Sequence, residues 1–574
     1  MKDSGVAATS LQSVDKSATS PFKEWAAALA VIFAAALFAF FRGVLFKRLE
    51  EGDEGTNATM ALNMCGSFEG VLHPSYLAGR AADWLTGSLP AMAVTPFHAG
   101  LVALAACPSH GSVAAMGLVS FAALAATVFC TFQLFAIWDR TAGLFAALLC
   151  AASPVLLLEF RELEMEPALT AFGIAGLLFL ARGVKRERAL ECTVAGALLG
   201  LAFLTKLWLA APPALAGLSL LLALRAPMRL WVAAAAGFFL AASLHLGFVA
   251  LFAPHDLITW LQRIYFAPFI KSGIAGSKLT GQGVPPNWIH PWWYYGVVLY
   301  RGHFFLMPLL MGGAPSVWAA RARLRAPLFT LGGGLLGIVL LSFTPVKEPL
   351  YMLSAIPLIY GLAGLSLSSV KREGTTPAAL KLAAVASVVS VLGLCLAYAK
   401  HIKPEDIDAT YVAGQALGLL AVNLVLWAST DARRWVAPLC GSMALLAFAV
   451  IDLRAPVQPF AEIAPLLREA VAHRPQQEAD FISPNYRVLG LYLFHNGRYW
   501  QSYYQTLATD WQEAYSTGRI CAFVFGPDDP ASKALEPPVA AVATDLTGRL
   551  PTWARAYHVY VNPACKTPWS PGIP

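Results

Sequence analysis

The chain has 574 residues, of which 57% are hydrophobic and only 13% are charged, and its mean hydropathy is positive. A water-soluble core could not bury that much apolar surface, so the composition excludes a soluble globular protein. The formal net charge of +7 comes largely from short connections between apolar segments. It predicts contact with anionic membrane lipids and gives no case for nucleic acid as a partner.

Apolar stretches of about twenty residues recur along the chain, and each is long enough as a helix to cross about 30 Å of hydrocarbon. Lipid satisfies no backbone hydrogen bonds, and the alternating segments of a membrane β-barrel are missing, so these stretches predict helices. We predict an all-α polytopic membrane bundle of about thirteen transmembrane helices, at about 25–46, 111–136, 142–160, 167–182, 190–207, 210–225, 229–253, 295–319, 326–343, 350–369, 378–399, 412–429 and 434–452.

The distribution of basic residues predicts the orientation of this bundle. The first apolar segment lacks a small-residue cleavage site and is followed at once by charged residues, so we interpret it as a signal anchor. With residues 1–24 as a disordered cytoplasmic tail, the basic residues of successive short connections all fall on the cytoplasmic side. They are Lys16, Lys23, Arg182, Lys185, Arg186, Arg188, Arg225, Arg229, Arg321, Arg323, Arg325, Lys371, Arg372, Arg433 and Arg434. The C-terminus is then extracytoplasmic.

The connections on the outer side are much longer than those on the cytoplasmic side. Within the transmembrane domain of residues 25–454, extracytoplasmic loops are predicted at about 47–110 and 254–294. Residues 455–574 contain strand-like runs at 487–494, 520–525 and 558–561, separated by Pro- and Gly-rich stretches. We predict a small extracytoplasmic α/β C-terminal domain. Short cytoplasmic loops and the lack of retrieval signals suit a bacterial inner (plasma) membrane.

The nine cysteines show no metal-ligand spacing. Seven lie in or near the predicted helices, and we interpret most of these as small apolar packing residues: Cys65, Cys107, Cys130, Cys150, Cys192, Cys395 and Cys440. Cys521 and Cys565 share the predicted C-terminal domain, and a disulfide between them stays open because the sequence does not give their separation.

The first of three charged clusters at outer helix ends is Glu51-Gly-Asp53-Glu54-Gly. A partly desolvated carboxylate at the membrane boundary can act as a general base, whereas a solvated juxtamembrane cluster is the structural alternative. The following tripeptide Asn57-Ala58-Thr59 matches a glycosylation acceptor pattern, and we interpret that match as coincidental because it lies beside the membrane.

The second cluster is Arg161-Glu-Leu-Glu-Met-Glu166-Pro167, at the outer junction between two predicted helices. Such charges are costly beside hydrocarbon unless they are paired, hydrated or functional. Pro167 suits the first turn of a helix, which would put Glu166 near a helix N-terminus, where the helix dipole favours an anion.

The third cluster is Thr344-Pro-Val-Lys347-Glu-Pro-Leu-Tyr351, at the outer end of the tenth predicted helix. A lysine beside a rigid proline turn at headgroup level suits a phosphate, and Tyr351 can add a hydrogen bond. The structural alternative is a snorkelling lysine beside an interfacial tyrosine.

The three clusters, in this order and on this topology, resemble the GT-C glycosyltransferases that use polyprenyl-phosphate sugars. The resemblance is to the branch of protein O-mannosyltransferases and the lipid A aminoarabinose transferase. It covers about 25–370 and depends on the order of the motifs. Asp53–Gly55 is similar to the first acidic motif, Thr95–His98 to a Lys-Pro-Pro-Leu segment, and Arg161–Pro167 to the second acidic motif. Gly200–Lys206 is similar to a stretch ending Leu-Thr-Lys-Gly, His290–Tyr295 to the aromatic start of the eighth span, and Lys347–Tyr351 to Lys-x-Pro-x-Tyr. Thr95 stands where the family usually has lysine, and no arginine opens the second span.

The resemblance implies a GT-C bundle that transfers a sugar, a hexose or a pentose, from a polyprenyl-phosphate donor to an extracytoplasmic lipid, glycan or protein, with inversion. It implies no cofactor and no metal. Asp53, with Glu54 beside it, is the expected general base, and Glu166 is expected to position a substrate or tune Asp53. Lys347 and Tyr351 are expected at the donor phosphate, with Lys206 and Arg161 as helpers.

The segment 254–294 carries Arg263, Lys271, Lys278 and His290 among Gly, Pro and aromatic residues. Two interpretations stay open: a flap that orders over the site and offers Arg263 and His290 to the acceptor, or a loop whose basic residues contact lipid phosphates.

Two other function classes also fit a polytopic chain. A transporter or flippase usually places ionisable residues near the membrane midplane and often has two related halves. The sequence has no evident internal repeat, and its one mid-span candidate, His245, is interpreted as packed or paired with a neighbouring helix. An inert scaffold presenting the C-terminal domain leaves the three clusters unexplained.

Overall fold

A computed structural model describes the helical part of the chain and a small sheet. The described residues are 57–58, 60–62, 64–65, 97–151, 153, 156, 160, 163–261, 291–303, 317–318, 320–322, 324–343, 349–373, 480–482, 501–503, 520–525, 540–543 and 556–561. The predicted helices 25–46, 378–399, 412–429 and 434–452 lie outside these residues.

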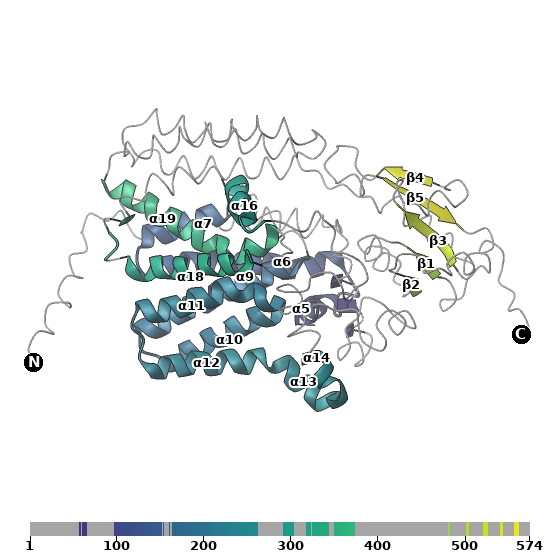
Figure 1. Cartoon of the computed structure of the whole chain (residues 1–574), viewed down its shortest axis with the longest axis horizontal. Helices are drawn as coiled ribbons and strands as arrows, with labels where there is room; N and C mark the ends of the chain where they lie inside the picture. The colour runs from purple at the N-terminus through teal and green to yellow at the C-terminus, as the bar shows by residue number, and fades with distance from the viewer. Residues whose placement is uncertain are drawn as a thin grey trace, which may run out of the picture.

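The first group of helices runs back and forth through the bundle in Figure 1. It comprises α5 (Phe97–Ala106), α6 (Val113–Ala136), α7 (Arg140–Ala151), α9 (Met165–Lys185), α10 (Ala189–Lys206), the short 3₁₀ helix η2 (Leu207–Ala210), α11 (Ala211–Ala223), α12 (Met228–Ala242) and α13 (Leu244–Phe252). Helix α5 lies in the segment 47–110 that was predicted to be a loop, whereas α6 to α13 match the predicted segments from 111–136 to 229–253, with α7 shorter than expected at twelve residues. Hydropathy therefore located α6 to α13 correctly.

The remaining elements of the helical part follow α13 in the chain. They are η3 (Pro254–Asp256), α14 (Leu257–Trp260), α16 (Tyr294–His303), α18 (Arg325–Leu341), the 3₁₀ helix η7 (Pro349–Ala355) and α19 (Ile356–Glu373). The predicted span 350–369 thus begins as a 3₁₀ helix and continues as α19. Of the predicted span 295–319, the structure describes α16 and two further residues.

Several described helices are long and apolar enough to cross a membrane. Four stretches qualify, at Val113–Ala136, Met165–Lys185, Ala189–Ala223 and Leu350–Ser369, and α12 with α13, bent by 43°, makes a fifth. The stretch 189–223 contains a chain reversal, because a Cβ on Gly217 would lie 3.3 Å from a methyl of Leu199. In one straight helix these two residues would be about 27 Å apart. The chain is an integral membrane protein with a helical bundle.

Small residues let the helices approach closely. A Cβ on Gly196 would lie 1.8 Å from the carbonyl oxygen of Ala234, and one on Gly237 would lie 2.0 Å from that of Thr193. Helices α10 and α12 therefore pack backbone against backbone, which is how helices associate in a bilayer that offers no hydrophobic driving force between them. Substituting either glycine would force these helices apart.

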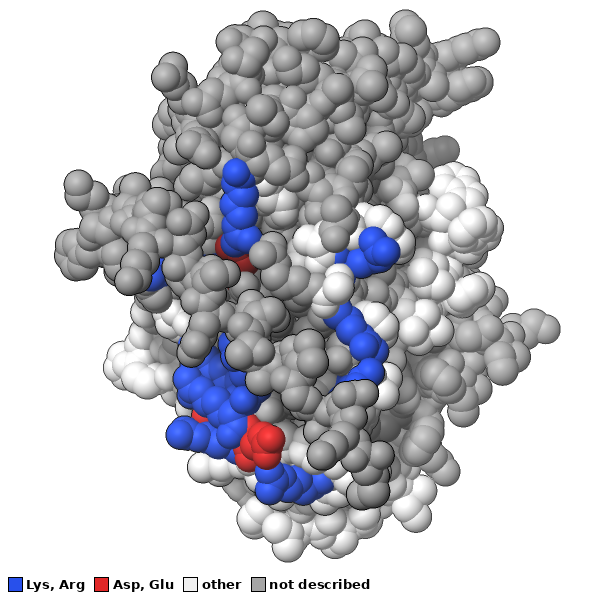
Figure 2. All heavy atoms as spheres, turned by 90° about the vertical axis from the view of Figure 1, so that its left-hand side faces the viewer, with Lys and Arg blue, Asp and Glu red and all other residues white. Residues whose placement is uncertain are grey.

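The basic residues gather at one end of the bundle. Figure 2 looks onto this end, the left-hand side of Figure 1, where Lys and Arg side chains are grouped with a few acidic residues. Arg229 pairs with Glu187 at 2.6 Å, and Arg372 pairs with Asp139 at 2.5 Å. Asp139 also accepts from the backbone amides of Thr141 and Ala142 at 3.0 and 3.2 Å, which caps the start of α7.

The C-terminal part contains a five-stranded sheet with the order β2-β1-β3-β5-β4. Its strands are β1 (Asp480–Ile482), β2 (Gln501–Tyr503), β3 (Ile520–Phe525), β4 (Ala540–Ala543) and β5 (Ala556–Val561). β1 pairs with β2 and β3 in parallel, whereas β5 pairs with β3 and β4 antiparallel. The runs 520–525 and 558–561 are strands, as predicted, and the run 487–494 lies outside the described residues.

Candidate active site

Parts of the second and third charged clusters, Glu166 and Tyr351, meet around Lys206 at the end of the bundle opposite the basic residues. Helix α9 has Glu166 in its first turn and Lys185 at its last residue. Nineteen residues at 1.5 Å each separate the two positions by about 29 Å, close to the thickness of the hydrocarbon layer. The site and the basic residues are therefore separated by the length of a transmembrane helix.

Glu166 is the buried carboxylate of the site. Helix α9 starts at Met165, with Pro167 in its first turn as predicted, so the Glu166 carboxylate lies where the helix dipole favours negative charge. The side chain of Glu166 is only 2% exposed, and its Oε1 forms a buried ion pair with Nζ of Lys206. A buried carboxylate is tolerated here because a cation and the helix N-terminus both stabilise its charge.

Lys206 is the last residue of α10, where the helix breaks sharply. The next residue, Leu207, has φ 42° and ψ −117°, a backbone conformation that residues with a Cβ rarely adopt. Such a conformation persists only where packing holds it. Leu207 is buried against Met60, Ala99 and Val249, and this packing holds the break directly after Lys206, whose side chain pairs with Glu166.

Tyr351 is the third residue of this cluster, with Glu166 and Lys206. It lies in η7, which packs mainly against α9, and its ring centroid is 5.4 Å from Nζ of Lys206. A cation over an aromatic face is attracted by the ring quadrupole. Lys206 is thus held between the carboxylate of Glu166 and the ring of Tyr351.

His98 lies beside this pair, on α5 between the first two predicted spans. Its side chain is 1% exposed. Burial lowers the pKa of His98 from 6.5 to about 4, and Lys206 acts in the same direction, whereas Glu166 and the Leu163 carbonyl raise it by less. His98 is therefore neutral at neutral pH.

Asn57 anchors the segment that follows the first predicted span to the second cluster. Its Nδ2 donates a hydrogen bond of 2.8 Å to the carbonyl oxygen of Leu163, and the residue is 2% exposed. The amide nitrogen that glycosylation would modify is thus buried and engaged. The match of Asn57–Thr59 to a glycosylation acceptor is accordingly structural coincidence, as expected.

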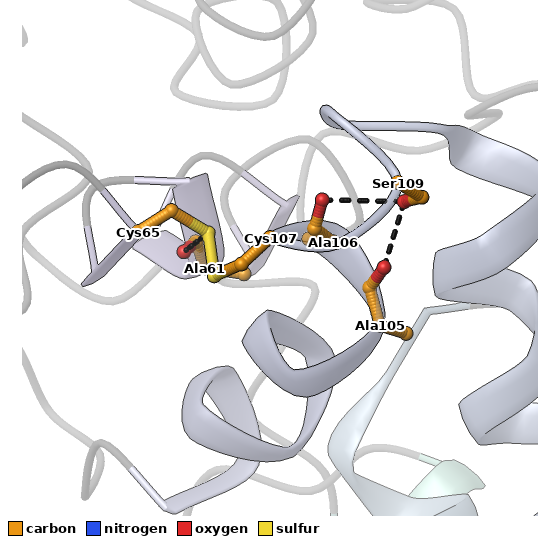
Figure 3. The surroundings of a disulfide bond; sticks show 6 residues. All are labelled: Ala61, Cys65, Ala105, Ala106, Cys107 and Ser109. Carbon is orange, nitrogen blue, oxygen red and sulfur yellow. Dashed lines mark hydrogen bonds between the residues drawn. A yellow bond between two sulfur atoms is a disulfide. The ribbon is translucent and has the colours of Figure 1, made fainter.

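Two of the seven cysteines that were interpreted mostly as packing residues, Cys65 and Cys107, instead form a disulfide, with Cα atoms 5.3 Å apart. Figure 3 shows it joining the helical segment of Ala61 and Cys65 to the C-terminal end of α5. Ser109 Oγ donates to the carbonyls of Ala105 and Ala106 at 2.7 and 3.2 Å, which ends α5 there. Both cysteines fall in the predicted outer segment 47–110, and that shared location was the available signal.

Removing this disulfide with Cys65→Ser/Cys107→Ser is expected to lower stability by about 2–4 kcal/mol, because the bridge closes a long loop. Thermal unfolding of the protein in detergent, with and without a reductant, measures the effect. Reductant should destabilise the wild type and leave the double variant unchanged. A wild type whose melting temperature does not respond to complete reduction would contradict the expectation.

The structure brings together three of the predicted site residues: Glu166, Lys206 and Tyr351. Asp53, Glu54, Arg161, Lys347, Arg263 and His290 lie outside the described residues. Asn57 and His98 were not among the predicted site residues, although both occur in segments already singled out by their motifs. No local pattern distinguishes a buried histidine in a site from one packed in a core.

Comparisons with known proteins support the motif-based resemblance. Residues 93–256 match the family described as dolichyl-phosphate-mannose-protein mannosyltransferase. A search of curated protein sequences found no significant match. The fold is similar to that of ArnT from Cupriavidus metallidurans in the apo state, with a TM-score of 0.65 and 18% identity over 94% of this chain and 99% of that chain.

Two further solved structures have the same fold. ArnT from Cupriavidus metallidurans bound to undecaprenyl phosphate gives a TM-score of 0.64 and 17% identity, over 93% of this chain and 98% of that one. The Archaeoglobus fulgidus oligosaccharyltransferase in its apo form gives 0.50 and 15%, over 88% and 70%. The resemblance inferred from the motifs is therefore confirmed, and this chain has the fold of the GT-C membrane glycosyltransferases.

Proposed function

We propose that this protein is a membrane glycosyltransferase that moves a sugar from a polyprenyl-phosphate donor to an extracytoplasmic acceptor, with inversion at the anomeric carbon. The observation that carries the proposal is the buried Glu166–Lys206 pair beside Tyr351 and His98, at one end of a GT-C fold. These four residues come from four separate elements, α5, α9, α10 and η7, and packing alone does not require that they meet.

The chemistry assigns a task to each kind of side chain. The bond between the anomeric carbon and the phosphate oxygen breaks, and the acceptor oxygen forms the new bond while its proton passes to a carboxylate. Positive charge develops on the sugar and negative charge on the departing phosphate, so cations must meet the phosphate. Lys206 suits this role because an ammonium has three N–H donors and can serve more than one partner. Lys347 and Arg161 are proposed to assist it.

Chain connectivity supports the remaining assignments. Asp53 precedes Asn57 by four residues, and Lys347 precedes Tyr351 by four. Because four residues span at most about 14 Å, each charged residue is tethered to an anchor in the site. Asp53 is proposed as the general base, with Glu54 beside it, and Lys347 as a phosphate contact.

The class of donor substrate is inferred from the fold, whereas the acceptor is proposed only as one of three classes of molecule. A structure with this fold binds undecaprenyl phosphate, which supports a polyprenyl-phosphate sugar as donor, either a hexose or a pentose. The acceptor is proposed to be a lipid, a glycan or a protein that meets Arg263 and His290. No metal or other cofactor is part of the proposal.

The proposed orientation puts the site outside the cytoplasm, with about thirteen spans and the C-terminal domain of residues 455–574 on the same side. The Cys65–Cys107 disulfide supports it, since such bonds persist in oxidising compartments, and the basic end of the bundle would then face the cytoplasm. A bacterial inner membrane meets both conditions.

The test is sugar transfer from a panel of labelled polyprenyl-phosphate hexoses and pentoses, with membranes containing the protein and an acceptor extract. We expect one donor to be consumed, with release of the polyprenyl phosphate and label in the acceptor. Membranes with Asp53→Asn protein serve as the control. If folded wild-type protein consumes no donor, the proposal fails and transport of a lipid or solute becomes the better hypothesis.

A further inference from the structure

His98 is a buried polar side chain that is only 1% exposed, and among the residues that the structure describes neither of its ring nitrogens makes a well-formed hydrogen bond. The carbonyl oxygen of Leu163 is near enough to affect its pKa, but that oxygen already accepts a hydrogen bond of 2.8 Å from Asn57. A neutral imidazole has one donor and one acceptor, and burying either without a partner is costly. An apolar residue would fill the same space without that cost, so the histidine calls for an explanation other than packing.

Glu166 has an unused acceptor in the same place. Its Oε1 pairs with Lys206, whereas its Oε2 is buried and makes no hydrogen bond within the described part of the chain. The residues on either side of His98 contact the helices that carry Glu166 and Lys206: Phe97 packs on Phe172 of α9, and Ala99 packs in one cluster with Leu207, which follows Lys206. Glu166 and Lys206 accordingly lie close enough to His98 for their charges to affect its pKa. A donor and two acceptors from α5 and α9 therefore share one buried region.

This combination suits a hydroxyl group better than a phosphate. A hydroxyl donates one hydrogen bond and accepts others, so it can donate to Oε2 of Glu166 and accept from the N–H of His98. A phosphate offers only acceptors and negative charge, which the free oxygen of Glu166 would repel. Lys206, on the other side of the Glu166 carboxylate, provides the cation that a phosphate needs.

The helix that carries His98 is fixed at both ends, so the ring is held in place before a ligand arrives. At its start, Phe97 packs on Phe172 of α9 with ring centroids 5.9 Å apart. Just past its end, Cys107 is joined to Cys65. Fixing a hydrogen-bonding group in advance reduces the entropy lost when a ligand binds.

We propose that His98 and Oε2 of Glu166 together bind a carbohydrate hydroxyl, and so position the sugar whose phosphate Lys206 contacts. The inference rests on the proposed glycosyl transfer and adds a residue that recognises the carbohydrate. The hydroxyl belongs either to the donor sugar or to the acceptor, and the two sources differ in which substrate binds less well when His98 is replaced.

The test compares His98→Phe, which keeps the ring size and removes both nitrogens, with His98→Gln, which keeps a donor and an acceptor. Binding of unglycosylated polyprenyl phosphate and of the polyprenyl-phosphate sugar is measured by ligand-induced thermal shift, and the KM of each substrate by sugar transfer. Loss of one hydrogen bond is expected to weaken binding about tenfold. Monodeoxy analogues of the donor sugar identify the hydroxyl, because the matching analogue should bind wild type and His98→Phe equally.

A donor-sugar hydroxyl predicts that His98→Phe binds polyprenyl phosphate like the wild type and the sugar donor about tenfold more weakly, with most of the loss recovered in His98→Gln. An acceptor hydroxyl predicts unchanged donor binding and a similar rise in the acceptor KM. Equal affinities and KM values in His98→Phe and wild type would overturn the inference. So would equal losses in both variants that extend to polyprenyl phosphate. If His98→Phe does not fold, His98→Leu replaces it, and a wild type that transfers no sugar would instead refute the proposed function.

Discussion

Replacing Lys206 with methionine is expected to lower kcat by about 100-fold or more, the usual effect of removing one group that stabilises charge in a transition state. Lys206 pairs with Glu166 and lies over Tyr351, so methionine removes the cation while keeping most of the side-chain volume. The change also leaves Glu166, 2% exposed, without its ionic partner, which costs about 3–5 kcal/mol of stability when a buried pair is broken. Sugar transfer and thermal unfolding are measured on the same preparation.

Two further variants separate catalysis from stability. Lys206→Met/Glu166→Gln removes the buried charge and should recover much of the stability without recovering activity. Asp139→Asn weakens an ion pair and a helix cap at the opposite end of the bundle, so it should lower stability and leave sugar transfer by the folded protein unchanged. Normal turnover by a folded Lys206→Met protein would remove Lys206 from the proposed mechanism.

Asp53→Asn is expected to reduce kcat by about 100- to 10,000-fold, the range typical of losing a general base. Asparagine has nearly the same shape as aspartate but cannot take the acceptor proton at neutral pH. The anchor four residues later, the hydrogen bond from Asn57 to Leu163, does not involve Asp53, so the local structure should persist. The measurement is single-turnover sugar transfer with the donor identified for the wild type.

Donor binding provides the control for this variant. Because the base acts on the acceptor, Asp53→Asn should bind the polyprenyl-phosphate sugar as the wild type does, and Glu54→Gln should lose much less activity. A large loss for Glu54→Gln with near-normal turnover by Asp53→Asn would move the base to Glu54. Full activity of the Asp53→Ala/Glu54→Ala protein would show that neither residue is the general base.

The two ends of the bundle are defined chemically before the fold is known. In the sequence, basic residues occur at one set of helix ends and the acidic clusters at the other. The structure agrees, because Glu166 and Arg372 lie at opposite ends of the bundle. What the sequence did not indicate is that Glu166 takes Lys206 as its partner. The two are separated by 40 residues, and Arg161, only five residues from Glu166, was an equally reasonable partner.

For the described residues, the sequence by itself determined the positions of the long apolar helices, their order and the strands 520–525 and 558–561, because hydropathy and alternation are local properties of consecutive residues. Only the tertiary structure decided the Cys65–Cys107 bond, the hydrogen bond from Asn57 to Leu163, and the burial of His98 beside Glu166. These contacts join segments tens to more than a hundred residues apart. They depend on the distance between neighbouring helices. Side chains from several helices together set that distance, so it cannot be read from any single stretch of sequence.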